Sequence, residues 1–250
     1  MPFITKFLRH CIEPSISISP WRYKEIAFIV FATSFIRAFS LFLRLAILIN
    51  NTKEIVHVNK RVPILFLIKN KCLFVKKYDP QKLKFEKREN IAILNVPCGN
   101  VIIELDPNVA PNSVKRFKIL IRSGEYNNVA FHRVIKNVLV QAGDLEFGKK
   151  DNLNYSYIGT GKSSLGTIDS ELDKPFDFKK GSVALARTSE KNTEDSQFFI
   201  LLKDAPLFAG EYSPLGKVIY GLDALKKIKY NDKVEFVLRP DFINSFKMLK

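Results

Sequence analysis

From residue 90 to residue 238 the chain alternates short apolar segments with turn residues, and this spacing limits the fold more than any other feature. Ile91–Val96 and Val101–Leu105 flank the turn Pro97-Cys98-Gly99-Asn100, a pattern typical of a β-hairpin. Further short strands are predicted at Phe131–Ile135, Val138–Gln141, Gly181–Arg187, Gln197–Leu202, Leu215–Tyr220 and Lys233–Leu238. So many short strands in one domain predict a mainly β fold.

Two segments in this region have helical periodicity. The first begins near Pro111, which suits a first helical turn, places Val114 and Phe117 on one apolar stripe, and ends at Gly124. The second runs from about Leu222 to Lys229. Two helices beside many strands predict a closed antiparallel barrel capped by the helices, over residues 90–238. The remaining residues, 239–250, are predicted to be a surface tail.

The basic charge of the chain belongs mostly to an N-terminal extension, residues 1–89. The extension has 17 Lys and Arg against 6 Asp and Glu, a net +11, whereas residues 90–250 have 23 against 19, a net +4. The predicted barrel is therefore nearly balanced, which argues against a basic surface that tracks phosphates. No nucleic-acid partner is expected, although an RNA-binding role of the extension stays an alternative.

Residues 26–49 are long and apolar enough to be a signal or membrane anchor. On an insertion scale, their Leu, Ile, Val and Phe residues contribute about −7 kcal/mol, while Arg37 and Arg44 cost about 4 to 6 kcal/mol. The balance favours insertion of a partly helical extension. A helix lying in the membrane interface and a buried helix of a soluble domain remain alternatives. A second apolar patch, residues 62–75, is too short to span a bilayer.

The cysteines and histidines give no sign of a metal or cofactor. Cys11, Cys72 and Cys98 are odd in number and widely separated, so no disulfide framework is implied. The three histidines are equally scattered, and no group has metal-ligand spacing. We expect no cofactor.

Three runs of residues resemble the signatures of one family. The first is Phe-His-Arg-Val-Ile-Lys-Asn-Val-Leu-Val-Gln-Ala-Gly-Asp, residues 131–144. The second is Gly-Ser-Val-Ala-Leu-Ala-Arg-Thr, residues 181–188, followed by Asp-Ser-Gln-Phe-Phe-Ile at 195–200. The third is Ala-Pro-Leu-Phe-Ala-Gly-Glu-Tyr-Ser-Pro-Leu-Gly-Lys-Val, residues 205–218. Together they resemble the cyclophilins, and Ala186-Arg187-Thr188 with Tyr212 is similar to the bacterial branch.

The resemblance implies an eight-stranded barrel closed by two helices, with peptide bound in a groove on its outer face. It also implies a peptidyl-prolyl cis/trans isomerase, whose partners are proline-containing polypeptides. Rotation about an X-Pro bond is slow because it breaks amide resonance, and it needs neither a nucleophile nor a metal. A donor that stabilises the twisted amide is sufficient.

Arg133 is the predicted donor, because a guanidinium is always charged and offers several N–H groups in a rigid fork. Read by itself, Arg133 would be an ordinary surface arginine, and the motif around it reverses that reading. The resemblance adds Gln141 and Phe199 to the catalytic set. The implied substrate-binding residues are Val138, Leu139, Ala186, Arg187, Thr188, Gln197, Leu207, Phe208 and Tyr212.

Strand periodicity supports this assignment for one segment. Successive side chains of a strand alternate between faces, so Gln197 and Phe199 share one face while Phe198 points into the barrel. His132, next to Arg133, is predicted to point to the opposite face and to be structural.

Two residues depart from the family pattern. Val138 stands where the family usually has Phe, which predicts a looser proline pocket and a modest enzyme. Leu207 occupies a position that many eukaryotic members fill with Trp, so cyclosporin should bind weakly. A non-catalytic peptide-binding or chaperone module of the same fold is the alternative function.

The extension and the resemblance together predict a bacterial protein that is membrane-associated or periplasmic. A cytoplasmic protein is the alternative if residues 1–89 do not target it. A monomer is the default expectation.

Overall fold

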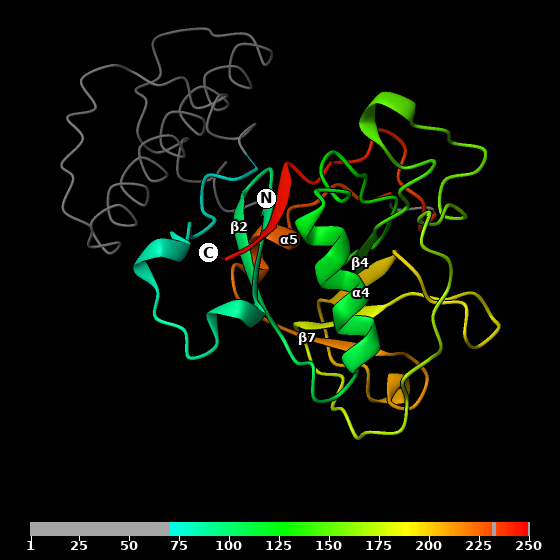
Figure 1. Cartoon of the computed structure of the whole chain (residues 1–250). Helices are drawn as coiled ribbons and strands as arrows, with labels where there is room; N and C mark the ends of the chain where they lie inside the picture. Colours follow the sequence, from blue (N-terminus) through cyan, green and yellow to red (C-terminus); the bar gives the residue numbers. More distant parts are fainter. Residues whose placement is uncertain (1–70, 232–233, 250) are drawn as a thin grey trace, which may run out of the picture. The chain divides into compact units, whose positions relative to one another are not determined.

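The computed structural model describes residues 71–231 and 234–249 (Figure 1). The predicted anchor at 26–49 lies outside these residues, as does most of the apolar patch at 62–75. Within the described ranges, none of the helices has the length and apolar character that crossing a bilayer requires.

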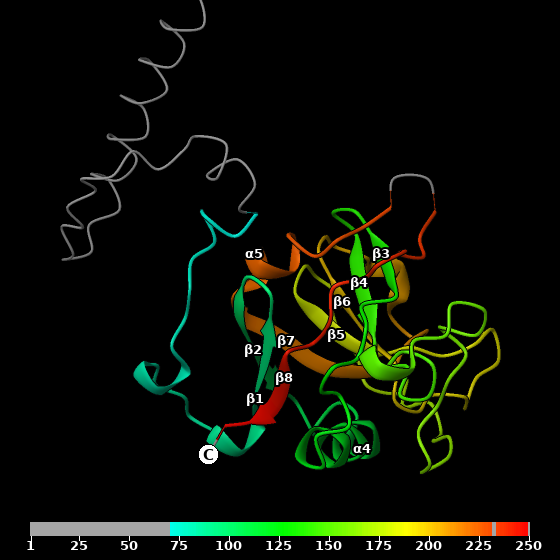
Figure 2. The same ribbon diagram turned by 90° about the horizontal axis from the view of Figure 1, so that it is seen from above.

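Eight strands form one antiparallel sheet in the order β3-β4-β6-β5-β7-β2-β1-β8 (Figure 2). The strands are β1 (Ile91–Val96), β2 (Gly99–Leu105), β3 (Arg133–Ile135), β4 (Leu139–Ala142), β5 (Ser182–Leu185), β6 (Phe198–Leu201), β7 (Pro214–Tyr220) and β8 (Ser245–Met248). The mainly β prediction and the β1–β2 hairpin are confirmed.

The predicted closure of the barrel is not confirmed. Strands β3 and β8 lie at opposite ends of the sheet order, and no strand ladder joins them in the described residues. The segments beside these two strands do pair. Asn128 N–H donates to the Ile243 carbonyl at 2.8 Å, and Phe131 N–H donates to the Asp241 carbonyl at 2.9 Å. The sheet is therefore curled, and its ends are connected by irregular backbone pairing.

Among residues 71–231 and 234–249, two α-helices accompany the sheet, α4 (Pro111–Arg122) and α5 (Leu222–Leu225). The first agrees with the prediction: Pro111 is its first residue, Val114 and Phe117 are buried, and Gly124 follows its end with φ +76°. The second is shorter than predicted. Four short 3-10 helices complete the described elements, at Pro80–Lys82 (η1), Arg88–Asn90 (η2), Lys150–Asn152 (η3) and Pro206–Phe208 (η4).

The prediction for the C-terminal end was wrong. Residues 234–238 make only an isolated bridge, in which Phe236 pairs with Arg133, and the last strand is β8. Residues 239–249 are not an appendage, because β8 pairs with β1 and Phe246 is 1% exposed. The Phe246 ring lies 5.5 Å from the ring of Phe117 on α4. Ile243 and Phe246 of this segment belong to the main core. The polar residues between and around them made the segment read as a surface tail.

The sheet separates two apolar clusters. Phe198 and Ile200 of β6 belong to the main core, whereas Phe199 and Leu201 belong to a second cluster on the other face. This alternation confirms that Phe198 points inward and Phe199 outward. The second cluster is where the predicted site residues gather.

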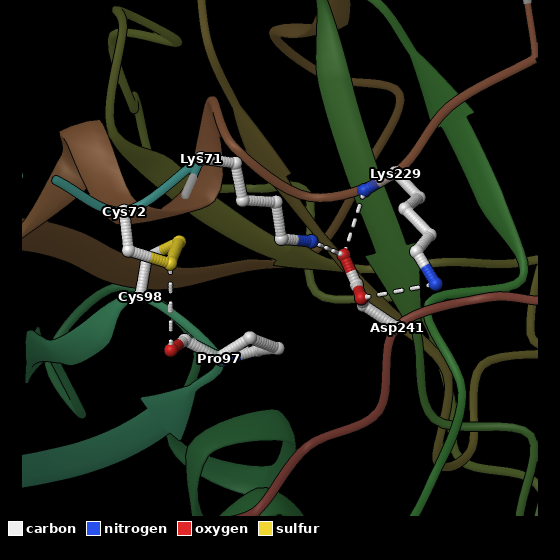
Figure 3. The surroundings of a disulfide bond; sticks show 6 residues. All are labelled: Lys71, Cys72, Pro97, Cys98, Lys229 and Asp241. Atoms are coloured by element: carbon white, nitrogen blue, oxygen red, sulfur yellow. Dashed lines mark hydrogen bonds and ion pairs between the residues drawn. A yellow bond between two sulfur atoms is a disulfide. The ribbon is translucent and has the colours of Figure 1, made fainter. Parts of the chain in front are cut away.

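No disulfide was predicted from the cysteine spacing, yet Cys72 and Cys98 form one, with sulfurs 2.05 Å apart (Figure 3). The same segment is held by Lys71, whose Nζ lies 2.5 Å from Oδ2 of Asp241. Asp241 also accepts from the Lys229 N–H at 2.9 Å. The cysteines are 26 positions apart, and their spacing does not reveal that the segment before β1 folds back to the β1–β2 turn.

This crosslink should contribute measurably to stability. A loop of this length loses enough entropy in the unfolded chain for the disulfide to stabilise the fold by about 2 to 4 kcal/mol. We expect Cys98→Ser to lower the free energy of unfolding in urea by that amount. Reductant should have the same effect on the wild type and no further effect on Cys98→Ser. Cys11→Ser is the control, and wild-type stability that is unaffected by reductant would contradict the expectation.

Candidate functional site

Four predicted or neighbouring residues form a row across adjacent strands. Arg133 of β3 is opposite Gln141 of β4, and Gln141 is opposite Phe199 of β6. Phe199 is in turn opposite Ala184 of β5. Residues directly opposite in antiparallel strands share a face, so Arg133 lies on the same face as Phe199. The predicted catalytic set is therefore brought together by the register of the sheet.

A chain of hydrogen bonds connects the polar members of this row. Nη1 of Arg133 donates to Oε1 of Gln141 at 3.2 Å, and Nε2 of Gln141 donates to Oε1 of Gln197 at 3.1 Å. Nε2 of Gln197 donates to the carbonyls of Gly159 and Gly161, both at 3.0 Å. The guanidinium and the two amides thus orient one another, and the carbonyls of Gly159 and Gly161 hold the last amide in place.

Aromatic rings form the apolar end of the site. The Phe199 ring lies 5.7 Å from that of Phe208 and 5.0 Å from that of Tyr212, and both pairs are edge-to-face. Leu139 is buried in the same cluster, and Val138 packs against it while partly exposed. This cluster could receive an apolar ring at its surface, as the prediction requires of a proline pocket.

Leu207 does not join these residues. It lies in η4, next to Phe208, but its side chain is 88% exposed. It is the one residue of the predicted binding set that lies neither in the apolar cluster nor in the pocket that adjoins Gln141 and Gln197. A short helical turn directs Phe208 toward the cluster and leaves its neighbour in solvent.

Arg187 is held firmly within the wall of the site. Its Nε donates to the Glu211 carbonyl and its Nη2 to the Glu211 carboxylate, both at 2.8 Å. Nη1 donates to the carbonyls of Thr188 and Ser189 at 3.0 Å. The guanidinium also lies 5.3 Å from the Tyr212 ring centroid. Its donors are therefore committed to structure, which distinguishes Arg187 from Arg133.

A pocket of about 230 Å³ adjoins the row. Its lining residues are Gln141, Gly159, Thr160, Gly161, Lys162, Ala186, Arg187, Thr188, Thr193, Asp195, Ser196 and Gln197. It includes five predicted residues, among them Ala186 and Thr188. The N–H of Ala186 donates to the Gln197 carbonyl at 2.8 Å, and that of Thr188 to Oγ1 of Thr193 at 3.1 Å. These two N–H groups therefore have their partners within the pocket wall, and a peptide bound at Ala186 and Thr188 would meet their other groups.

One residue that the sequence analysis did not single out organises the loop behind the pocket. The Asp144 carboxylate is fully buried and accepts from four backbone N–H groups. The donors are Glu146 at 3.2 Å, Phe147 at 2.7 Å, Gly159 at 2.6 Å and Gly161 at 3.1 Å. Asp144 closes the first signature run, and an acidic residue followed by a glycine-rich loop is the signal that could have found it.

Glu235 is a second residue of the site that the sequence did not indicate. Its Oε2 accepts from Nε of Arg133 at 2.6 Å and lies 2.6 Å from Nη2. The Arg133 side chain is 30% exposed and that of Glu235 is 51% exposed. The arginine is therefore paired but not buried. Nothing in the spacing of these residues, 102 positions apart, indicates the contact.

His132 lies on the opposite face from Arg133, and it is buried. Burial lowers the pKa of His132 from 6.5 to about 4, and the Arg133 cation adds to the shift, although Asp144 opposes it. Between pH 6.5 and about pH 4, His132 binds a proton in the unfolded chain but not in the folded one. The stability that neutral His132 contributes above pH 6.5 is therefore lost as the pH falls toward 4.

We expect the free energy of unfolding of the wild type to fall by about 3 kcal/mol over this window because of His132. His132→Gln should lack this component. Its free energy of unfolding, measured in urea at pH values from 7 to 4, should therefore change less with pH than that of the wild type. Parallel pH dependences for the two proteins would contradict the shift.

The fold and this outer face define a class of protein. Its members have a curled antiparallel sheet whose outer face carries an arginine, two amides and an aromatic cluster. Comparison with known proteins specifies the class further. Residues 91–248 match the family described as "Cyclophilin type peptidyl-prolyl cis-trans isomerase/CLD". The match includes all of β8, which agrees with the structural role of the C-terminal residues.

Curated relatives agree with the family match. A "Probable peptidyl-prolyl cis-trans isomerase" of Brucella suis is 42% identical over 158 residues, which are 62% of this chain and 80% of the relative. "Peptidyl-prolyl cis-trans isomerase A" of Dickeya dadantii is 36% identical over 141 residues, which are 54% of this chain and 69% of that protein.

Among solved structures, a cyclophilin-type isomerase of Cryptosporidium parvum, crystallised in the presence of the dipeptide Ala-Pro, has a TM-score of 0.56. It is 26% identical, and the alignment covers 64% of this chain and 99% of that one. The chain belongs to the cyclophilin-type peptidyl-prolyl cis-trans isomerase family. The activity of this family is rotation about the X-Pro bond.

Proposed function

We propose that Arg133 is the hydrogen-bond donor that accelerates X-Pro rotation in this chain, with the proline ring held against Phe199 and its aromatic neighbours. The observation that carries the proposal is the register that places Arg133, Gln141 and Phe199 directly across three strands. A peptide lying along this row would put its prolyl nitrogen within reach of the guanidinium and its ring on the aromatic cluster.

The proposed chemistry is electrostatic and non-covalent. As the amide twists, the lone pair returns to the prolyl nitrogen, and a cationic donor stabilises the changed charge distribution more than the planar ground state. Gln141 would hold the peptide backbone through its second N–H, because its first is donated to Gln197. Gln197 donates both of its N–H groups to the Gly159 and Gly161 carbonyls, so it would contact the peptide through its amide oxygen. No bond is broken in this step, so no nucleophile or cofactor takes part.

The experiment that separates an isomerase from a non-catalytic binder is a protease-coupled assay on an Xaa-Pro peptide. The proposal expects acceleration by the wild type that is largely lost in Arg133→Ala. Equal binding of the peptide by both proteins with no acceleration by either would support the alternative, a chaperone-like binding module. Because Val138 is small, we expect a modest rate. Because Leu207 is not Trp, we expect weak binding of cyclosporin.

We also propose that the chain works on exported or unfolded polypeptides in an oxidising compartment at the bacterial membrane, as a monomer. The Cys72–Cys98 disulfide supports this location, since disulfides persist in the periplasm and are rare in the cytosol. The mass of the mature protein in fractionated cells, measured with and without reductant, tests the location. Recovery in the cytosolic fraction with free thiols would contradict it.

A further inference from the structure

The segment that begins at residue 234 runs along the outer edge of β3. Val134 N–H donates to the Glu235 carbonyl at 2.9 Å, and Val237 N–H donates to the His132 carbonyl at 2.9 Å. Phe236 forms an isolated antiparallel bridge with Arg133. These backbone contacts fix the main chain of Glu235 next to that of Arg133, and the Glu235 side chain reaches the guanidinium from the position beside the bridged Phe236.

The pair occupies one edge of the guanidinium. Oε2 of Glu235 faces Nε and Nη2, each at 2.6 Å, while Nη1 donates to Gln141 at 3.2 Å. A guanidinium has five N–H groups, one on Nε and two on each Nη. After these contacts, Nη1 and Nη2 each keep a second N–H. The remaining N–H of Nη2 lies on the end of the fork, because its other N–H faces Glu235 on the side edge. The end of the fork can therefore still donate to a peptide while its side edge is held.

We propose that Glu235 is a positioning residue that clamps Arg133 over the substrate row, an inference that rests on the proposed role of Arg133. Arginine has a long, flexible side chain, and a donor that is already in place stabilises a transition state better than one that must first be ordered. Gln141 alone would restrain the guanidinium through a single, longer hydrogen bond to a neutral group.

The negative charge of Glu235 also acts in the opposite direction, because it offsets part of the charge that Arg133 presents to the amide. Both partners are accessible to solvent, so water screens this offset. The geometric restraint is not screened in the same way, because Val134 and Val237 fix the backbone that holds it. The net effect of Glu235 is therefore a gain in rate.

The test is a pair of substitutions made in two backgrounds. We expect Glu235→Ala to lower kcat/KM for an Xaa-Pro peptide by about threefold to tenfold, mainly through kcat. In the Arg133→Ala background the same substitution should change kcat/KM by less than about twofold, because its target is gone. Glu235→Gln, which keeps the size and an acceptor oxygen, should lose less than Glu235→Ala.

Glu125 provides a matched control, since its side chain is 49% exposed and pairs with Lys149 at 3.6 Å. Glu125→Ala should leave kcat/KM unchanged in both backgrounds. The inference is overturned if Glu235→Ala is as active as the wild type or more active. It is also overturned if the loss is the same in both backgrounds, which would indicate a general structural effect. A near-ultraviolet circular dichroism spectrum confirms that each variant is folded.

These outcomes separate the inference from the function on which it rests. A large loss on Arg133→Ala with none on Glu235→Ala refutes the clamp and leaves the donor role intact. No loss on Arg133→Ala refutes both.

Discussion

Arg133→Ala is expected to lower kcat/KM for an Xaa-Pro peptide by about a hundredfold, a cost similar to that of removing one preorganised donor from other polar active sites. The reason is the position of the guanidinium, which is on the same face as Phe199 and remains 30% exposed despite its ion pair. Arg133→Lys should lose most of the same activity, since an ammonium keeps the charge but not the fork that meets Gln141 and Glu235.

Arg122→Ala is the control for this series, because Arg122 is exposed at the end of α4. It should match the wild type in the protease-coupled assay. An Arg133→Ala protein that keeps the wild-type rate would mean that another group stabilises the twisted amide.

Asp144→Ala is expected to lower the free energy of unfolding by about 3 to 5 kcal/mol. Its carboxylate is fully buried and accepts from the N–H groups of residues 146, 147, 159 and 161. The substitution would remove the acceptor of all four donors at once. Activity should also fall, because Gln197 is anchored on the carbonyls of Gly159 and Gly161.

Urea unfolding and kcat/KM measured on the same preparation test both effects. Asp177→Ala removes an exposed carboxylate that pairs with Lys179, and it should cost less than about 1 kcal/mol. If Asp144→Ala were as stable as this control, the carboxylate would not be what holds the loop.

The parts of the molecule that could be predicted are those in which local pattern and tertiary structure agree. The β1–β2 hairpin and the helix α4 follow from a turn sequence and from Pro111 with its apolar stripe. The separation of Phe198 from Phe199 follows from strand alternation alone. The family resemblance then assigned Arg133 and Gln141, which the register places directly opposite each other.

The parts that could not be predicted depend on contacts distant in sequence. Residues 239–250 were predicted to be a surface tail, but Phe246 lies in the main core, where its ring contacts that of Phe117, more than a hundred positions earlier. The pairing of Cys72 with Cys98 requires the preceding segment to fold back, and no local pattern reports that. The same holds for Glu235, whose position beside Arg133 is set by backbone pairing with β3. Leu207 shows the converse, since its place in a family signature did not predict its exposure.

The most direct test of the account is an NMR measurement of where a short Ala-Pro-containing peptide lies on the wild-type protein. We expect nuclear Overhauser effects from the proline ring protons to the rings of Phe199 and Phe208, with amide shift changes at Arg133 and Gln141. A second hollow, lined in part by Glu104 and Lys217, provides an internal comparison. Proline contacts there, or anywhere away from the row formed by β3, β4 and β6, would contradict the account.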